Sequence, residues 1–461
     1  VLIDEIQLLS DESRGWAWTA ALVGAPGRRV ILTGAPGCQK AVARIADMMG
    51  EELVITETQR LAPLEIEKRP TALARLTPGT AVIAFSRRDV LDLKATIEQA
   101  TGLRCAVIYG NLSPRVRREE ARRFREGEAD VIISTDAIAM GLNLPIVRVV
   151  FFTSVKYDGK RERTLTDHEI LQIGGRAGRY GKAASGHVTA LSREDLATIQ
   201  AAFDRGPSPI GPPFRVMPDE RHVELLGQVL GTASLERILT FFGQAITFDD
   251  EVFVPADLTD LCALAAVVDR KLPLVDAQTR LTFASAPVEA DNERMLTAWI
   301  RIMEAYANND ERKLGDLFDV DTFRQRRLTT DPFELLSAET QLKILTVYSW
   351  LAYRFPAVFR SLDVCDAAKD ELASFIEASL RGKTVRRCTS CGVTLPLGFR
   401  FSKCNRCFRG RSGADDDETG ARPADDTAST DGGGGTSGGW SPPRLGGPAR
   451  GNAGPSRGGS P

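Results

Sequence analysis

Two short motifs, far apart in the chain, carry the residue types that phosphoryl transfer requires. The first is Asp4-Glu5-Ile6-Gln7, directly after an apolar run, and the second runs from Gln172 to Arg179 and reads QIGGRAGR. Phosphoryl transfer depends on positioning a nucleotide, a magnesium ion and a water, and on positive charge that stabilises the transition state. The carboxylates of the first motif and the arginines of the second can supply these functions. Together they predict the two halves of one NTPase site.

The chemistry of each side chain suggests its role in that site. Asp4 is placed to hold the magnesium ion through a water, and Glu5 to orient or deprotonate the attacking water. Gln172 is expected to orient towards the γ-phosphate, while Arg176 and Arg179 are expected to act as arginine fingers. An acidic pair after a strand is otherwise a common turn, and the arginine motif is what favours the catalytic interpretation. Further residues of the two motifs are expected to bind the nucleotide: Gln7, Gly175 and Gly178.

Apolar, β-branched runs alternate with helical patterns between the two motifs. A helix is predicted after Ser113, which caps it, with Pro114 in its first turn and Gly127 at its end. Strands that alternate with helices at this spacing predict an α/β fold, in which a parallel sheet is covered by helices on both faces. Thr33, at the end of the first strand, is expected beside the nucleotide. The expected strands are 28–34, 81–85, 106–109, 131–134 and 148–152.

Several residues that follow these strands have the chemistry to contact nucleic acid. Ser86 and Arg87 can bind phosphates through a hydroxyl, backbone amides and charge. Thr135 is a candidate for an RNA backbone contact. Asp136 and Gly141, in the same turn, are candidates for binding the nucleotide and coupling it to that contact.

In the order and content of its motifs, the chain resembles a superfamily 2 DExH helicase, and more narrowly the mitochondrial degradosome RNA helicase and its bacterial relatives. The resemblance covers roughly residues 1–380 and implies two RecA-like lobes. It also implies ATP-driven movement, 3′ to 5′, along single-stranded RNA, and unwinding of duplexes ahead of an exoribonuclease. The stretches that carry it are 4–7, 14–19, 135–143, 172–179 and 280–287.

The sequence departs from this family at its start, because no phosphate-binding loop of the form G-x-x-x-x-G-K-[ST] precedes Asp4. The segment from Gly34 to Ala41 resembles such a loop but fails on chemistry. Gln39 replaces the glycine that lets phosphate approach the helix amides, and Ala41 lacks the hydroxyl that would ligate magnesium. We therefore expect the loop in sequence upstream of residue 1, and expect this chain to be an inactive carboxyl-terminal portion by itself.

Four cysteines near the carboxyl end have the spacing of a zinc site: Cys388-x2-Cys391-x12-Cys404-x2-Cys407. Two such pairs can bring four thiolates around one ion, and a site filled by thiolates is closed and structural. Basic and aromatic residues around the cysteines can either grip RNA or form the core of this small module. The composition that follows, rich in Gly, Pro, Ser, Asp and Arg, predicts a disordered tail.

Length and composition are those of a multidomain protein. The net charge of −2 requires RNA affinity to come from local grooves. No apolar run approaches the roughly 20 residues of a membrane span, so no membrane partner is expected. The expected division is the remainder of RecA-like lobe one at 1–66, lobe two at 67–204, a mainly helical accessory domain at 205–385, a zinc module at 386–410 and the disordered tail at 411–461.

The sequence thus predicts an ATP-dependent RNA helicase that uses ATP, Mg²⁺ and structural Zn²⁺. Its expected partners are single-stranded or partly duplex RNA and an exoribonuclease. Two alternatives fit the same residues: a non-hydrolysing RNA-binding regulatory subunit, and a DNA translocase that shares every ATPase motif. The alanine- and arginine-rich composition favours a bacterial cytoplasm over a mitochondrial matrix.

Overall fold

The computed structural model describes residues 1–60, 62–139, 141–158, 161–178, 185–248, 251–325, 328–329, 331–382, 390 and 407. By its internal contacts the chain divides into two units, Val1–Phe408 and Arg409–Pro461. The second unit lies outside the described residues, and so does the predicted disordered tail.

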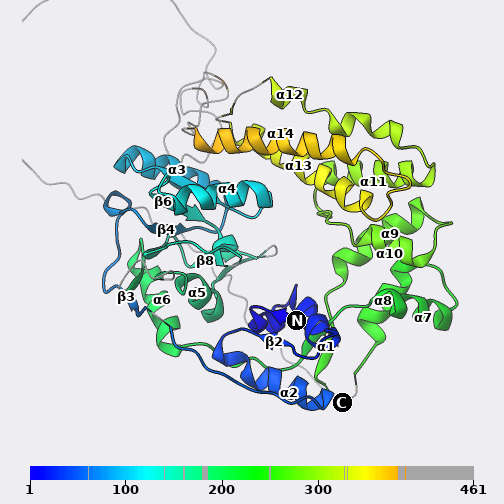
Figure 1. Cartoon of the computed structure of the whole chain (residues 1–461), viewed down its shortest axis with the longest axis horizontal. Coiled ribbons are helices and arrows are strands. Elements are labelled where there is room, and N and C mark those ends of the chain that lie inside the picture. The colour runs from blue at the N-terminus through cyan, green and yellow to red at the C-terminus, as the bar shows by residue number, and fades with distance from the viewer. Residues whose placement is uncertain are drawn as a thin grey trace, which may run out of the picture. The chain divides into compact units, whose positions relative to one another are not determined.

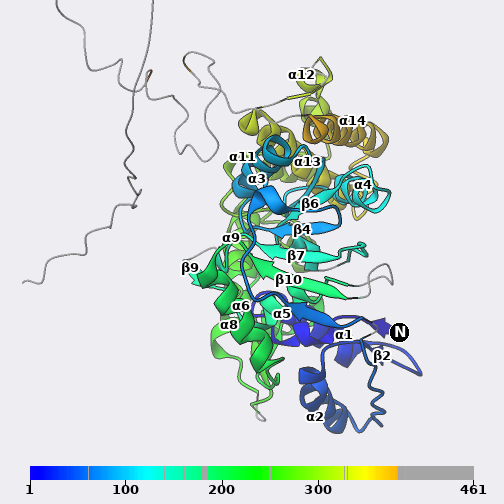
Figure 2. The ribbon, with the colours of Figure 1, turned by 90° about the vertical axis from the view of Figure 1, so that its left-hand side faces the viewer.

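The main sheet is built from parallel strands, as the sequence predicts (Figure 2). Its central strands are buried along their whole length, which explains why they read as continuous apolar runs instead of alternating ones. The six strands lie in the spatial order β3 (Leu64–Ile66), β10 (Gly186–Ala190), β7 (Arg148–Phe151), β4 (Thr80–Ile83), β6 (Val131–Ser134) and β5 (Cys105–Ile108).

Helices pack on both faces of this sheet. Two neighbouring residues of β4 show this, because successive side chains of a strand point to opposite faces. Val82 packs in the apolar cluster that includes α3 (Arg87–Thr101). Its neighbour Ala81 packs in the other cluster, with α5 (Asp167–Gly174) and α6 (Arg193–Arg205). The predicted parallel sheet covered by helices is therefore confirmed.

Helix α4 (Pro114–Arg125) begins and ends where the sequence predicts. Its first turn is capped by the Ser113 hydroxyl, which accepts a hydrogen bond from the Val116 amide at 3.4 Å. After it, Gly127 adopts a φ of 76°, a conformation that favours glycine.

The amino-terminal residues form a smaller apolar cluster, which also includes Phe214 and Val252. β1 (Leu2–Ile3) pairs in parallel with β2 (Ile31–Leu32). The strand predicted at 28–34 is therefore present, but β2 is shorter than that range. The buried residues of this cluster include Ile3, Ile6 and Leu9. The helical segments around them are η1 (Ile6–Ser10), α1 (Gly15–Gly24), η2 (Pro36–Cys38) and α2 (Gln39–Met49).

The region after α6 is mainly helical, as predicted (Figure 1). Its one described sheet is a short parallel pair, β11 (Phe214–Val216) with β12 (Phe253–Pro255). The helices are α7 (Glu220–Leu230), α8 (Leu235–Ala245), α9 (Thr259–Lys271), α10 (Ala277–Ala284), α11 (Glu293–Ala307), η5 (Glu311–Phe318), α12 (Asp321–Arg324), α13 (Pro332–Ala352) and α14 (Leu362–Arg381).

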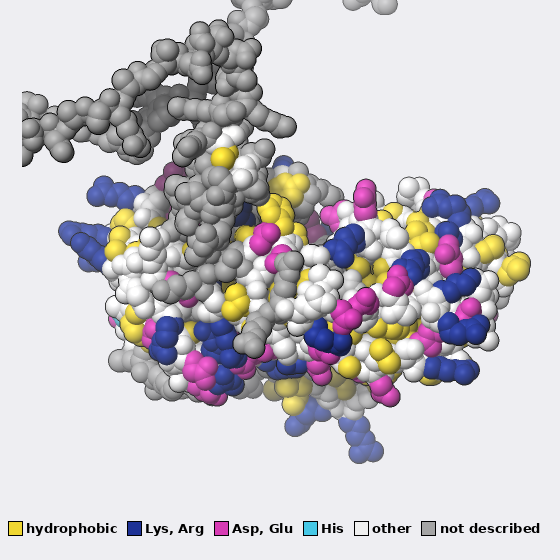
Figure 3. Space-filling model, turned by 90° about the horizontal axis from the view of Figure 1, so that it is seen from above, with side chains coloured by type: hydrophobic (Ala, Val, Ile, Leu, Met, Phe, Trp, Pro, Cys, Tyr) yellow, Lys and Arg dark blue, Asp and Glu magenta, His cyan; other side chains and the backbone are white. Residues whose placement is uncertain are grey.

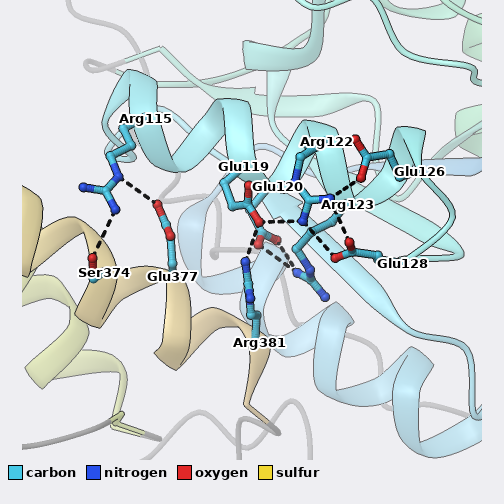
Figure 4. A network of polar contacts seen from close by, with 10 residues as sticks. All are labelled: Arg115, Glu119, Glu120, Arg122, Arg123, Glu126, Glu128, Ser374, Glu377 and Arg381. Atoms are coloured by element: carbon cyan, nitrogen blue, oxygen red, sulfur yellow. Dashed lines mark hydrogen bonds and ion pairs between the residues drawn. The ribbon is translucent and has the colours of Figure 1, made fainter.

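Ion pairs and hydrogen bonds join α14 to α4, which packs on the main sheet (Figure 4). Nε of Arg115, on α4, lies 3.4 Å from Oε1 of Glu377 on α14, and Arg115 donates to the Ser374 hydroxyl at 3.1 Å. Arg381, at the end of α14, pairs with Glu119 of α4. Arg115 and Glu119 of α4 thus serve packing between the two helices.

Charges of both signs share the surface of this part of the molecule. The face seen from above in Figure 3 carries Lys and Arg side chains interspersed with Asp and Glu. Ion pairs in the helical region include Arg301 with Asp316 and Arg324 with Glu371. Among the described residues, this face therefore presents a charge mosaic and not one continuous basic surface.

Candidate nucleotide site

Asp4 and Thr33 lie together because β1 and β2 are parallel neighbours. Ile3 pairs with Leu32, so the residues that follow them emerge at the same edge. The Thr33 hydroxyl donates a hydrogen bond to Oδ1 of Asp4, and the amide of Glu5 donates to the same oxygen at 2.9 Å. The Asp4 side chain is also exposed, so a hydrated cation can reach its carboxylate.

Glu5 occupies the left-handed region of backbone conformation, with φ 55° and ψ 46°. Residues other than glycine seldom adopt this conformation, and it costs about 1–3 kcal/mol where it persists. Buried Gln7 supports the arrangement: its amide nitrogen donates to Oε2 of Glu5, and its Oε1 accepts from the amide of Ala35 at 3.1 Å. Gln7 therefore links the carboxylate motif to the loop after β2.

Arg176 joins the second motif to the first. Its Nη2 lies 3.4 Å from Oε1 of Glu5. The guanidinium also donates to the carbonyls of Ala139 and Leu142, the latter at 3.3 Å. The structure thus brings together the two sequence motifs that were expected to form one site.

Gln172 lies one helical turn before Arg176, on α5. Its Nε2 atom is buried and donates to no group among the described residues. An amide that is buried without a partner costs free energy, so a ligand that accepts from it is favoured here. Together with the carboxylates of Asp4 and Glu5, which Mg²⁺ prefers as ligands, Gln172 fits a magnesium-bound nucleotide.

The glycines of the arginine motif have packing reasons for being glycine. A Cβ on Gly175 would lie 2.7 Å from the carbonyl oxygen of Leu171. Gly178 has a φ of 69°, and a Cβ there would lie 2.7 Å from the amide of Gly186. These contacts shape the loop, and the nucleotide contact expected for both glycines stays a prediction. The predicted second finger, Arg179, lies outside the described residues.

Arg60 is a residue of this site that sequence reasoning missed. It precedes the first strand of the main sheet and donates to the carbonyls of Gly175, at 3.0 Å, and Ala177, on either side of Arg176. Its Nε donates to the carbonyl of Ala62 at 2.8 Å. Because its partners are backbone oxygens far away in the sequence, no local pattern could have revealed it.

The turn after β6 lies beside Arg176, and its polar side chains have partners within the protein. Thr135 is buried, and its hydroxyl accepts a hydrogen bond from the amide of Ala137 at 3.3 Å. Asp136 pairs with Lys156 at 3.4 Å. Gly141 has a φ of 68° and bends the chain before Leu142. The turn therefore reaches the nucleotide side through its carbonyls, while the RNA contact assigned to Thr135 stays a prediction.

Ser86 and Arg87, the predicted phosphate contacts, both have partners within the protein, and their contact with nucleic acid stays a prediction. The Ser86 hydroxyl caps α3, where it accepts from the amide of Asp89 at 3.0 Å and donates to its carboxylate at 2.7 Å. Arg87 pairs at 2.9 Å with Glu339 of α13, and Tyr109 donates to the same carboxylate at 2.6 Å. The Ser-x-x-Asp spacing is a capping signal that could have indicated the first of these roles.

The predicted zinc ligands fall mostly outside the described residues. Cys388, Cys391 and Cys404 are outside them, and Cys407 is half-buried. Among the side chains that the structure does describe, no group of three or more His, Cys, Asp or Glu residues could hold a metal ion. The zinc site therefore stays a prediction.

Three family models match separate parts of the chain. Residues 1–58 match the DEXQ-box helicase domain of Suv3, residues 67–181 the helicase conserved C-terminal domain, and residues 335–382 the SUV3 C-terminal domain of ATP-dependent RNA helicases. The matches contain the carboxylate motif, the arginine motif, and most of α13 with all of α14, respectively.

Relatives extend the similarity over most of the chain. The mitochondrial ATP-dependent RNA helicase SUV3 of Saccharomyces paradoxus is 33% identical over 382 residues, which cover 80% of this chain and 51% of the relative. The mitochondrial helicase DExH16 of Arabidopsis thaliana is 33% identical, with 83% and 66% covered. The human mitochondrial helicase SUPV3L1 is 29% identical, with 83% and 49% covered. The chain thus spans about half the length of the yeast and human relatives.

The relatives correct one expectation from composition. The alanine- and arginine-rich sequence favoured a bacterial cytoplasm, but the relatives are named as mitochondrial proteins, so that prediction was wrong. In the part of the chain that the structure describes, no helix is long and apolar enough to cross a membrane.

Proposed function

Because the chain belongs to the Suv3 type of superfamily 2 DExH helicases, we propose that it acts as an ATP-dependent RNA helicase. The observation that carries the proposal is the contact between Arg176 and Glu5, which joins the two motifs. A single site made from both motifs is what ATP hydrolysis requires.

The residues of the site divide the work of hydrolysis between them. Asp4 would hold Mg²⁺, which neutralises phosphate charge when it is bound. Glu5 orients or deprotonates the attacking water, and Gln172 contacts the γ-phosphate. Arg176, with Arg179 three residues later in the sequence, supplies positive charge to the transition state.

The substrate in this proposal is single-stranded or partly duplex RNA, along which the protein moves 3′ to 5′. The relatives' names identify RNA helicases, so they favour RNA over DNA and an enzyme over a non-hydrolysing subunit. We further propose a role in RNA degradation with an exoribonuclease, in the mitochondrial matrix. The support for these finer points is the resemblance of the motifs to the degradosome helicase.

The test compares RNA with DNA as activators of ATP turnover, and measures the direction of unwinding. We would measure ATP turnover by the full-length protein with RNA and with DNA of one sequence, and unwinding of duplexes with a 3′ or a 5′ overhang. The proposal predicts stimulation by RNA and unwinding from the 3′ overhang. Equal stimulation by DNA would favour the translocase alternative, and RNA binding that ignores ATP would favour the regulatory subunit.

The division into domains is also part of the proposal. We propose that 1–66 belongs to the first RecA-like lobe, 67–204 forms the second, and 205–385 is the helical accessory domain. We also propose that residues 386–410 fold around one structural Zn²⁺ held by Cys388, Cys391, Cys404 and Cys407, and that 411–461 is a disordered tail. Metal analysis of the purified protein tests the zinc site, which predicts one zinc per chain. Absence of zinc from the intact protein would refute it.

A further inference from the structure

A short hairpin stands between the turn after β6 and helix α5. Its strands are β8 (Val155–Tyr157) and β9 (Glu162–Thr164), and Lys156 lies directly opposite Arg163. Like charges directly opposite in an antiparallel pair are destabilising. The hairpin therefore needs an anion between these two cations.

Glu169 supplies that anion from outside the hairpin. Its Oε1 lies 2.5 Å from Nζ of Lys156, and Arg163 holds both of its oxygens, at 2.8 and 2.9 Å. The same carboxylate accepts from the amide of Thr166 at 2.9 Å, which completes the capping box of α5. One side chain thus ties both strands of the hairpin to the first turn of the helix.

The helix that Glu169 anchors is the one that leads into the candidate site. α5 ends at Gly174, so Gln172 and Arg176 lie within two turns of the anchored end. Buried Ile170 and Ile173 hold the helix in the apolar cluster of the sheet. The contacts of Glu169 add polar partners that fix its first turn against the hairpin.

A second set of contacts connects the hairpin to Arg176. Lys156, which contacts Glu169, also lies 3.4 Å from Oδ2 of Asp136. Asp136 begins the turn η4 (Asp136–Ala139), whose last carbonyl accepts from Arg176. The hairpin therefore contacts both the helix that precedes Arg176 and the turn that receives its guanidinium.

We propose that Glu169 is a positioning residue, which uses the β8–β9 hairpin to hold Gln172 and Arg176 in place for ATP hydrolysis. This inference rests on the proposed function. It assigns no contact between Glu169 and the nucleotide. The Lys156–Glu169 pair acts through the helix and the turn that it joins.

Glu169→Gln is the informative variant, with Asp167→Asn as its matched control. Glutamine keeps the capping box because its carbonyl oxygen accepts from the same amide, but it loses the charge that pairs both cations. Asp167 also lies in the first turn of α5 and also pairs with an arginine, but that arginine is Arg205 of α6, away from the hairpin. The two variants therefore remove equal charge from the same turn.

The expected result separates turnover from binding. In the full-length protein, Glu169→Gln should lower the RNA-stimulated kcat about tenfold, since a small misplacement of catalytic groups is costly, with little change in KM for ATP or in RNA affinity. Asp167→Asn should keep the wild-type kcat. Adding Lys156→Met to Glu169→Gln should cost less than the two single losses combined, because both act through one contact.

Hydrogen exchange on the same variants tests the positioning without relying on activity. Amides of residues 167–178 should exchange faster in Glu169→Gln than in the wild type or Asp167→Asn. Unchanged exchange there, or an unchanged kcat in an active protein, would overturn the inference. A wild-type protein without RNA-stimulated turnover would instead contradict the proposed function, and the exchange result would still decide whether Glu169 positions the helix.

Discussion

Nη2 of Arg176 lies 3.4 Å from Oε1 of Glu5, although 171 positions of sequence separate the two residues. Arg176 is 7% exposed and also donates to the carbonyls of Ala139 and Leu142. A guanidinium fixed in this way loses little further entropy when it meets a phosphate. The contact makes two distant motifs into one candidate site.

Replacing Glu5 by glutamine should separate nucleotide binding from hydrolysis. Glutamine can still accept from Gln7 but cannot take a proton from water, so kcat should fall by about 10²–10⁴ while ATP still binds. Rapid-quench measurement of phosphate release, alongside binding of labelled ATP, checks both parts. Hydrolysis at the wild-type rate in Glu5→Gln would remove Glu5 from the catalytic role.

Arg60→Met should loosen the loop that carries Arg176. The substitution keeps an extended side chain but removes the donors to Gly175 and Ala177, and each carbonyl left unsatisfied costs about 1–3 kcal/mol. We expect a lower free energy of unfolding and a reduced kcat. Denaturant unfolding and ATPase assays measure these effects.

The control for Arg60 is Arg312→Met, which removes a surface guanidinium that is 91% exposed and pairs with Asp310. Such a pair contributes less than about 1 kcal/mol. Equal effects of the two variants would mean that the contacts of Arg60 with the loop have no special importance.

Arg87→Ala should destabilise the protein without weakening RNA binding specifically. Glu339 is 1% exposed, and removing its cation leaves a buried charge unpaired, at a cost of about 3–5 kcal/mol. Arg88→Ala, which removes a 53% exposed neighbour, should change stability by less than about 0.5 kcal/mol. If the RNA affinity of folded Arg87→Ala depended less steeply on salt concentration than that of the wild type, the phosphate contact predicted for Arg87 would be supported.

Acid should destabilise the protein partly through Glu169. Burial would raise the pKa of this carboxyl, but hydrogen bonds from Arg163 and Lys156 outweigh it and lower the pKa from 4.5 to about 2. A pKa depressed by folding adds stability above the ordinary value, and that stability is lost as pH falls towards 2. The unfolding temperature should therefore drop between about pH 5 and pH 2.

Comparison with Glu169→Gln isolates the contribution of this carboxyl. The variant should show a shallower fall of unfolding temperature over the same pH range, measured by calorimetry. Some slope should remain, because hydrogen bonds from Arg14 also lower the pKa of Asp11 to about 2 against the effect of its burial. An identical slope in the variant and the wild type would contradict the assignment.

The sequence predicted those structural features that depend on neighbouring residues. The buried strands read as apolar runs, and Ser113 marked the start of α4 because capping depends on neighbouring residues. The β8–β9 hairpin was not predicted because its strands are short and largely polar, although the Asp158-Gly159 dipeptide between them is a turn signal.

Contacts between distant residues explain most of what the sequence did not indicate. The pairing of Arg87 with Glu339 could not be anticipated, because the two residues are 252 positions apart. Arg60 bonds to backbone carbonyls, which leave no mark on residue type. The pairing of Glu5 with Arg176 could be anticipated because both belong to recognisable motifs whose chemistry is complementary.

The most direct test of the central claim is RNA-stimulated ATP turnover by Arg176→Ala in the full-length protein. If Glu5 and Arg176 form one hydrolytic site, kcat should fall by about 10³ or more, the usual contribution of an arginine finger, while RNA binding persists. Arg122→Ala, which removes an ion-paired arginine of α4 away from the site, should keep the wild-type rate. Wild-type turnover by Arg176→Ala would contradict the account.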